Sequence, residues 1–424
     1  MASPPENRNE FEIAIICALR CEYNAVSRVI DQFWDADYGR GAGDPNTYAT
    51  GRIGAFNVVL VLLSGIGKAS AASATASLRT SYPGLNFALI TGICGGVPAP
   101  GTDEELLLGD VVIGKTVVQY DLGRKYPDGF QTKNTLDDNL GRLTKNIRNF
   151  VQLFETDLAR EQIEERAAVH LAELQTRTLG KRRIASYQYP GASQDILFRA
   201  NYCHQHQDSS QSPCEGCNGN SAHVCEESRT LSCQELECDK RQIIQRERLW
   251  EKGILESNGR IKEAQAPYVF VGRFGSADTV LKSGEECDTM AKRHGLMAFE
   301  MEGAGAWDEV PCIIVKGVCD YADSHKNKRW QDFAAATAAC VTKALVERYP
   351  QTDKPLNNST DTSSFGSMNE RGSPGIGSVR YGNISGGNVL TGIHSSGGTQ
   401  NFNFGNRRDA SQPLVGYYEE MDSS

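Results

Sequence analysis

Apolar runs alternate with helical patterns over the first 120 residues of the chain. Four runs are continuous, which predicts buried strands: FEIAIICAL from Phe11, FNVVLVLL from Phe56, NFALITGI from Asn86 and DVVIGKTVVQY from Asp110. Residues 21–33 place apolar side chains at helical spacing, and residues 68–80 form an alanine-rich helical pattern. Continuous apolar strands are typical of a sheet that helices cover on both faces. The pattern therefore predicts an α/β fold.

Strand patterns return late in the chain, after a long polar interval. The segments PYVFVGRF, GLMAFEME and PCIIVKGVCD have the composition of strands, and QDFAAATAACVTKALVERY that of a helix. The interval, about residues 130–267, contains charged helical patterns between residues 136 and 180 and is poor in strand formers from residue 199 onward. Long loops inside compact domains are usually functional or disordered. We therefore expect an inserted lid that interrupts one sheet built from both halves.

The two ends of the chain differ in composition from the middle. We expect residues 1–10 to be disordered, residues 11–350 to form one domain, and residues 351–424 to form a low-complexity tail of glycine, serine and asparagine. Within the tail, residues 378–406 place asparagine steps and sparse apolar residues between glycines. This composition fits cross-β stacking, and the segment resembles short amyloid signalling motifs; a disordered tail is the alternative.

Charge and hydropathy exclude several classes of function. The net charge is -9, so the chain lacks the basic footprint of a nucleic-acid-binding protein. No run reaches the roughly 18 apolar residues of a membrane span. The first residues are acidic and polar, where a secretory signal would be basic and then apolar. We expect a cytoplasmic protein without nucleic-acid or membrane partners.

Six of the thirteen cysteines lie between Cys203 and Cys238. An odd total and one local cluster argue against a secreted disulfide framework. The CEGC motif and the cysteines and histidines around it favour a structural zinc site that includes Cys214 and Cys217. The alternative is a flexible flap with reduced thiols. We expect no cofactor for catalysis.

Glycine-rich turns and acids occur together at the ends of the predicted strands. The turns are SGIGK, TGICGG and GRFGSAD, and the acids are Glu22, Glu302 and Asp320. Ligands of open α/β sheets bind beyond the carboxyl ends of the strands. One carboxylate could hold sugar hydroxyls, a second activate water and a third protonate a leaving group, as glycosidic chemistry requires. Alternation predicts that Glu300 and Glu302 face the same way, with Met301 opposite unless the chain bends.

The chain resembles the nucleoside phosphorylase and nucleosidase family in an ordered set of motifs: FEIAIICALRCEYNAV, LLSGIGKASAA, ITGICGG, LGDVVIG, GSADTV, AFEMEGAGAW and VKGVCDYADSHKNKRW. It is most similar to the branch found as an N-terminal domain in fungal NLR-type immune proteins. The resemblance implies a three-layer fold with a central mixed, mostly parallel sheet flanked by helices. It also implies a homo-oligomer, and an NLR or amyloid-motif partner that binds through the tail.

The resemblance further implies roles for single residues. Asp320 would protonate or hydrogen-bond purine N7, and Glu22 would activate water. Glu302 would hold the ribose hydroxyls beside Met301. Other substrate contacts would come from the glycine turn, from an aromatic residue on the base and from basic residues near a phosphate: Gly92, Cys94, Gly95, Phe299, Arg20, His325, Lys326, Lys328 and Arg329.

The predicted reaction follows from one departure from the family pattern. Phosphorylases of the family hold phosphate with an arginine and a serine, where this chain has Ile90 and Ile93. Apolar side chains are a poor phosphate cradle, although Arg20 keeps a phosphate site open. We therefore expect hydrolysis of a purine nucleoside or an adenine nucleotide such as ATP, with release of free base. A phosphate-dependent phosphorylase and a non-enzymatic nucleotide-sensing module are the alternatives.

Overall fold

The computed structural model of the protein describes residues 3–101, 104–133, 135, 138–206 and 224–351. The chain divides into two units, Met1–Asp353 and Lys354–Ser424, and everything below concerns the first. Cys214, Cys217 and the predicted tail with its 378–406 motif lie outside the described residues. The zinc and amyloid hypotheses made for these segments therefore stay predictions.

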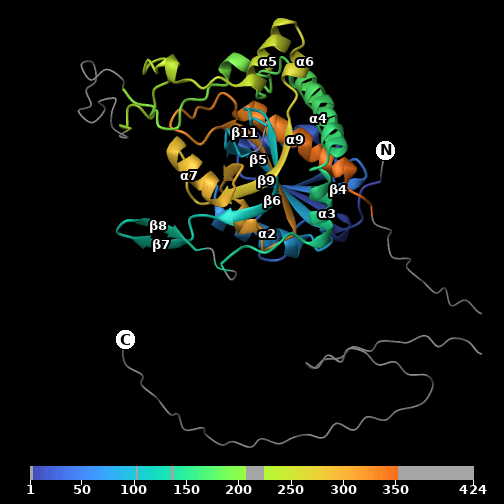
Figure 1. The fold of residues 1–424 in the computed structure, drawn as a ribbon. Coiled ribbons are helices and arrows are strands. Elements are labelled where there is room, and N and C mark those ends of the chain that lie inside the picture. The colour runs from blue at the N-terminus through green and yellow to red at the C-terminus, as the bar shows by residue number, and fades with distance from the viewer. Residues whose placement is uncertain (1–2, 102–103, 134, 136–137, 207–223, 352–424) are drawn as a thin grey trace, which may run out of the picture. The chain divides into compact units, whose positions relative to one another are not determined.

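One nine-stranded sheet forms the centre of the first unit, in the order β10-β9-β6-β11-β5-β1-β4-β3-β2 (Figure 1). Its strands are β1 (Ile13–Cys17), β2 (Gln32–Phe33), β3 (Tyr48–Ile53), β4 (Phe56–Leu62), β5 (Phe87–Gly96), β6 (Val111–Gln119), β9 (Val269–Ser276), β10 (Ala298–Glu300) and β11 (Cys312–Asp320). The pairs β1–β4, β1–β5, β5–β11, β6–β9 and β9–β10 are parallel. The pairs β6–β11, β5–β10, β3–β4 and β2–β3 are antiparallel. A separate hairpin consists of β7 (Gly123–Tyr126) and β8 (Gly129–Thr132).

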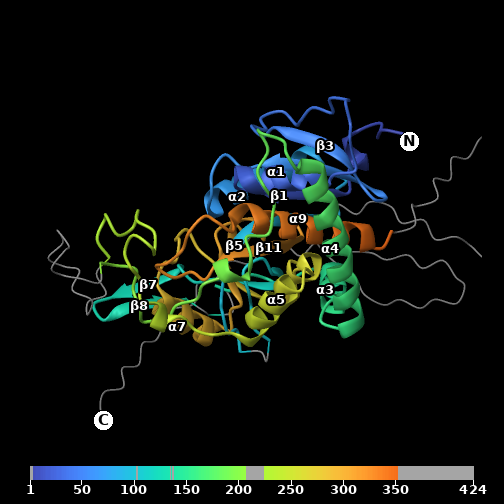
Figure 2. The same cartoon turned by 90° about the horizontal axis from the view of Figure 1, so that it is seen from above.

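Helices cover both faces of this sheet. They are α1 (Arg20–Val29), α2 (Lys68–Ser81), α3 (Lys145–Leu153), α4 (Asp157–Thr178), α5 (Glu247–Ser257), α6 (Ile261–Ala264), α7 (Gly284–His294), α8 (Gly303–Ala306) and α9 (Gln331–Arg348). Helices α1, α9 and α4 lie side by side, as Figure 2 shows. Helix α2 lies on the other side of the sheet in Figure 1, where it packs against α8. The predicted three-layer α/β fold, with strands from both halves in one mixed sheet, is confirmed.

The apolar runs of the sequence correspond to β1, β4, β5, β6, β9, β10 and β11. Their side chains are almost completely buried, because helices cover the sheet on both faces. The patterns did not predict β3, whose sequence YATGRI is half polar, or α7, whose sequence GEECDTMAKRH is mostly charged. Both elements are more exposed than the central strands, and their apolar signal is correspondingly weak.

The inserted segment is not a lid throughout. Helix α4 packs against α9 and buries a stripe of small and aliphatic side chains in the main core: Ala159, Ile163, Ala167, Leu171 and Leu174. These residues recur at intervals of three and four, so they form one face of the helix. The first half of the insertion therefore belongs to a helical layer of the fold, which corrects the prediction of a lid for these residues.

The N-terminal residues are also more structured than predicted. Residues Arg8–Glu10 form a 3-10 turn capped by the side chain of Asn7. Pro5 is buried, and its carbonyl accepts a hydrogen bond of 2.9 Å from the Tyr38 hydroxyl. These contacts fix a segment that has too few apolar residues to predict any structure from its sequence.

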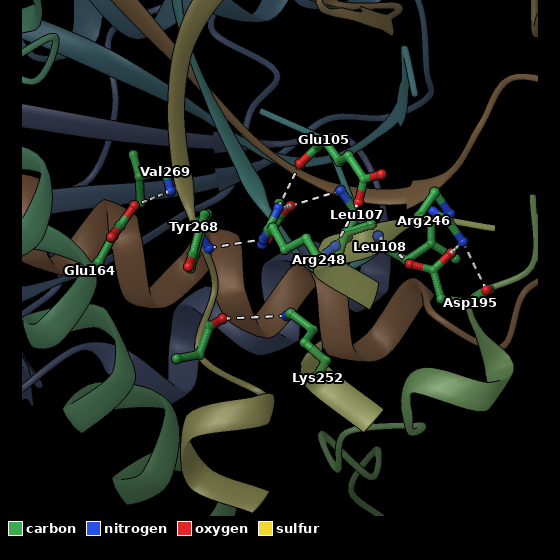
Figure 3. Close-up of polar contacts among 12 residues, drawn as sticks. Glu105, Leu107, Leu108, Glu164, Asp195, Arg246, Arg248, Lys252, Tyr268 and Val269 are labelled. Atoms are coloured by element: carbon green, nitrogen blue, oxygen red, sulfur yellow. Dashed lines mark hydrogen bonds and ion pairs between the residues drawn. The ribbon is translucent and has the colours of Figure 1, made fainter. Parts of the chain in front are cut away.

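Buried ion pairs join the second half of the insertion to the sheet (Figure 3). Arg248 donates to both carboxylate oxygens of Asp110, at 2.5 and 2.6 Å, immediately before β6. Arg246 donates to Asp195 at 2.8 Å, and Asp195 also accepts from the Tyr321 hydroxyl at 2.8 Å. Tyr321 directly follows the last residue of β11. The insertion therefore helps to hold the end of that strand.

Replacing Asp110 with alanine is expected to destabilise the fold strongly. The Asp110 side chain is completely buried, and it accepts hydrogen bonds from two backbone amides as well as from Arg248. Its loss leaves a buried guanidinium without its partner, which costs about 3–5 kcal/mol. Urea unfolding measures the change. The control is Glu155→Ala, which breaks the exposed Lys115–Glu155 pair. It should lower the free energy of unfolding by about 0–1 kcal/mol. Equal losses of stability in the two variants would contradict a special role for the buried pair.

Candidate active site

A cavity of about 200 Å³ lies at the carboxyl ends of β1, β5, β10 and β11. Eight of the residues predicted from the sequence line it: Glu22, Cys94, Gly95, Phe299, Met301, Glu302, Asp320 and Lys326. They come from four separate strand ends and the loops that follow them, which the parallel arrangement of the sheet brings to one edge. Ile66, Val280 and Glu300 are among the other lining residues.

Glu22 lies in the first turn of α1 and bonds to backbone on two sides. Its Oε2 atom accepts from the amides of Ala18 and Leu19, both at 2.8 Å, and its Oε1 atom from the amide of Ile93 at 2.9 Å. Burial raises the pKa of Glu22, and Lys316 partly opposes this effect. A carboxylate has about four acceptor positions. Three are in use, so one remains for a water molecule.

Gly92 makes room for the Glu22 carboxylate. A Cβ atom at position 92 would lie 2.1 Å from Glu22 Oε1, far inside van der Waals contact. Glycine at this position therefore has a local steric reason, independent of any contact with a ligand.

Glu302 forms a buried ion pair with a lysine that the sequence analysis did not select. Lys316 Nζ lies 2.9 Å from Glu302 Oε2, and the lysine side chain is 1% exposed. Burial alone would lower the pKa of Lys316, but the charges of Glu302 and Glu22 hold it above its usual range. The amide of Gly67 lies 3.4 Å from the other oxygen of Glu302. Glu302 thus keeps acceptor positions for hydroxyl groups.

A bend after β10 separates the roles of Glu300 and Glu302. The Glu300 carboxylate accepts from the amides of Glu302 and Gly303, at 2.8 to 3.0 Å, and so fixes the start of α8. Met301 lies in the bend and lines the same cavity as Glu302. The strand alternation that would place Met301 opposite therefore does not continue past Glu300.

Asp320 is positioned by a bulge and a left-handed turn. The register of β11 against β5 shifts between Val318 and Asp320, and bulges re-aim side chains next to functional sites. Ala322 has φ 54°, a conformation that costs an alanine about 1–2 kcal/mol. In this conformation the Ala322 amide donates to Asp320 Oδ1 at 3.0 Å. The turn therefore holds one oxygen of Asp320 in place.

The second oxygen of Asp320 is paired with Lys326. The distance between Lys326 Nζ and Asp320 Oδ2 is 2.9 Å, and the thiol of Cys319 donates to the same oxygen at 3.1 Å. Burial lowers and Asp320 raises the pKa of Lys326, and the net direction is upward. Burial raises the thiol pKa of both Cys319 and Cys94, so neither is suited to act as a nucleophile.

Phe299 forms part of the apolar wall of the cavity. It is buried, and its ring packs edge-on against Tyr120 with centroids 5.7 Å apart. Leu281 and Ala322 belong to the same small apolar cluster and also line the cavity. A flat aromatic ligand could pack on this wall.

Five predicted substrate contacts do not line the cavity: Gly92, which lies against Glu22, and four basic residues. Arg20, Lys328 and Arg329 are exposed, and Arg329 donates to the Gln194 side chain. His325 is buried and stacks on Phe198 with ring centroids 4.0 Å apart. Their roles with phosphate or a polyphosphate tail stay predictions.

Lys316 and Lys326 each pair with an acid of the cavity, and the sequence did not reveal either contact. Lys316 lies inside the apolar segment CIIVKGVCD. Because a buried charge needs a partner, a single lysine in such a segment indicates a buried ion pair. Lys326 belongs to the predicted basic block, but its pairing with Asp320 depends on the turn between them. The spacing of residues along the sequence predicts neither of these two ion pairs.

The motifs, the fold and the acidic cavity together resemble those of the nucleoside phosphorylase and nucleosidase family. Residues 12–171 match the family model described as the phosphorylase superfamily, which confirms the resemblance seen in the motifs. A curated protein of Hyaloscypha variabilis, described as a nucleotide-binding leucine-rich repeat (NLR)-like protein, is 27% identical over 343 residues. The alignment covers 80% of this chain but only 29% of that protein.

Solved structures that match include a futalosine hydrolase of Helicobacter pylori and a 5'-methylthioadenosine/S-adenosylhomocysteine nucleosidase of S. pneumoniae. Their identities to this chain are 15% and 18%, and both TM-scores are 0.43. Each alignment covers 80% of this chain, with 98% and 99% of the other chains. The activity proposed below rests on the cavity and on the family match.

Proposed function

We propose that this domain hydrolyses the N-glycosidic bond of a purine nucleoside or an adenine nucleotide and releases the free base. The proposal rests on one observation: besides Glu300, which holds the start of α8, three carboxylates line one cavity, and each has a different set of partners. Glu22 bonds to backbone amides, Glu302 to a buried lysine, and Asp320 to Lys326 and the Ala322 amide. Different environments give identical groups different chemical roles.

The proton for the leaving base comes from the Asp320–Lys326 pair. An ionised carboxylate only accepts hydrogen bonds, so the proton reaches purine N7 from whichever member of the pair holds it. Protonation makes the base a better leaving group, and the bond between C1' and N9 breaks with its electrons going to the base. Positive charge develops on the sugar ring, near Glu302 and Glu22.

The nucleophile is a water molecule bound at Glu22. As the water oxygen bonds to C1', Glu22 takes one of its protons, and the products are the free base and the sugar or sugar phosphate. Burial raises the pKa of Glu22, which makes it a stronger base than an exposed carboxylate. Glu302 accepts from the ribose hydroxyls, and Lys316 holds its other side through the ion pair.

Hydrolysis is favoured over phosphorolysis because backbone donors near the cavity already bond to carboxylates. The Ile93 amide donates to Glu22, and the Lys68 amide, at the start of α2, donates to Asp278 at 2.8 Å. The ammonium group of Lys68 pairs with Asp121 at 2.5 Å. A phosphate ion at this edge of the sheet would lie next to carboxylates that already accept from these donors. The negative charges would repel it.

The setting of the reaction is also a proposal. The similarity to an NLR-like protein supports a role in a fungal NLR-type immune or cell-death response, with a small-molecule substrate inside the cell. In the described residues, no helix has both the length and the apolar character needed to cross a membrane.

Incubation of the purified protein with adenosine, inosine, AMP and ATP tests the proposed function. Free base should appear with at least one substrate in phosphate-free buffer, as measured by liquid chromatography. Base release that requires added phosphate would replace hydrolysis by phosphorolysis. Binding without any base release would favour the nucleotide-sensing module.

A further inference from the structure

The second half of the insertion has a very small apolar core of its own. Phe198, Leu236 and Cys238 are its buried members, with Tyr202, Leu231, Cys233 and Ile243 packed around them. The described residues between 199 and 206 and between 224 and 239 form neither helix nor strand. Segments of this kind usually require a disulfide or a metal ion for stability.

Three metal-binding side chains converge in this small core. The donor atoms of His204, Cys233 and Cys238 all lie within 4.8 Å of one another. His204 Nδ1 is 3.7 Å from Cys233 Sγ and 3.5 Å from Cys238 Sγ. Zinc–sulfur bonds of about 2.3 Å and zinc–nitrogen bonds of about 2.1 Å at tetrahedral angles place nitrogen and sulfur about 3.6 Å apart. Both nitrogen–sulfur distances therefore already match those of a tetrahedral zinc site.

The orientation of the His204 ring also fits a metal ligand. His204 Nε2 lies 2.9 Å from the Leu231 carbonyl oxygen. A carbonyl only accepts, so Nε2 has the hydrogen, and in the neutral ring the lone pair of Nδ1 points to the two sulfur atoms. A backbone carbonyl on the second nitrogen is the usual partner of a metal-bound histidine.

The sulfur atoms of Cys233 and Cys238 both face the same imidazole nitrogen, His204 Nδ1. The thiolate is the form that binds metal ions. His204 and Cys238 are 5% and 9% exposed, so a bound ion would be shielded from solvent on their side.

We propose that His204 Nδ1, Cys233 Sγ and Cys238 Sγ bind one zinc ion that stabilises the second half of the insertion. Two thiolates and one imidazole favour zinc over magnesium or calcium, which prefer oxygen ligands. One position of a tetrahedral ion remains for a water molecule or a further donor. This donor set differs from the pair Cys214 and Cys217 that the sequence favoured.

The zinc site also contacts the loop that follows Asp320. The amide of His204 donates to the Ser324 hydroxyl at 2.9 Å, and the rings of His204 and His325 pack edge-on with centroids 5.2 Å apart. Ser324 and His325 directly precede Lys326, the partner of Asp320. The ion therefore stabilises the segment against which this loop packs.

Elemental analysis of the purified full-length chain tests the proposal. After dialysis against buffer without metal, we expect about one zinc ion per chain. Cys233→Ser and Cys238→Ser should each lose this zinc and unfold at a lower temperature. Cys203→Ser is the matched control, because Cys203 is a half-buried thiol next to His204 but is outside the cluster; it should retain the zinc.

Cobalt(II) provides a second measurement that does not require a serine variant to fold. Wild-type chain stripped with a chelator should take up cobalt(II) with a thiolate charge-transfer absorption, and zinc should displace it. A wild-type chain that purifies without zinc and gives no such absorption would overturn the proposal. Retention of zinc by Cys233→Ser and Cys238→Ser, or its loss from Cys203→Ser, would show that the donor set is wrong. None of these readouts depends on the proposed hydrolase activity.

Discussion

Asp320→Asn is expected to abolish release of free base while the fold stays intact. Asparagine retains an oxygen that can accept from the Ala322 amide, but it cannot pass a proton to the purine. It also no longer holds Lys326, the other member of the proton-donating pair, in an ion pair. Loss of a general acid of this kind lowers kcat by about 10²- to 10⁴-fold. Base release under saturating substrate measures the effect.

Asp323→Asn is the matched control for this experiment. Asp323 lies in the same loop, outside the cavity, and the side-chain oxygen that accepts from the His325 amide is retained in asparagine. This variant should keep near wild-type kcat. Full activity of Asp320→Asn would mean that the proton comes from elsewhere and that the proposed active site is wrong. Thermal unfolding of both variants separates a catalytic loss from a folding defect.

Glu22→Gln is expected to lower kcat by about 10²- to 10⁴-fold, because an amide cannot take a proton from water. The pH dependence provides the sharper measurement. Glu22 acts as a base only when ionised, and burial raises its pKa. For the wild-type domain, kcat/KM should therefore rise with pH through a value above the ordinary range of a glutamate.

In Glu22→Gln, kcat/KM of the residual activity should not show this rise with pH, which is the acid limb of the pH profile. An acid limb that persists unchanged in the variant would assign the titration to another group and would contradict the role of Glu22 as the base. Because glutamine brings an NH₂ group toward amides that now donate to Glu22, circular dichroism must first show that the variant is folded. Added phosphate should not restore the activity.

The central strands could be predicted because their burial is visible in the sequence. Continuous apolar runs such as those of β1, β5 and β11 have few alternatives to a strand covered on both faces. Strand β3 and helix α7 lacked this signal, since their stability depends on neighbours rather than on their own composition. Helix α4 was predicted as a helix, but its sequence could not show that α9 would cover its apolar face.

The candidate site could be predicted only in part. Glu22, Glu302 and Asp320 each follow an apolar strand, and parallel strands bring such positions to one edge. The basic residues near Asp320 looked alike in the sequence, yet Lys326 faces the aspartate while Lys328 and Arg329 are exposed. The bulge in β11 and the left-handed turn at Ala322 decide which of these basic residues faces Asp320.

The sequence by itself determined the α/β class of the fold and the three acids at the ends of its strands. Both follow from local features, namely apolar runs and the residue type that ends each run. Only the tertiary structure decided what each acid can do, because their partners come from distant parts of the chain. Glu22 bonds to Ile93 and Glu302 to Lys316 and Gly67. Burial and these partners set the environment of each carboxylate, and neither can be derived from neighbours in the sequence.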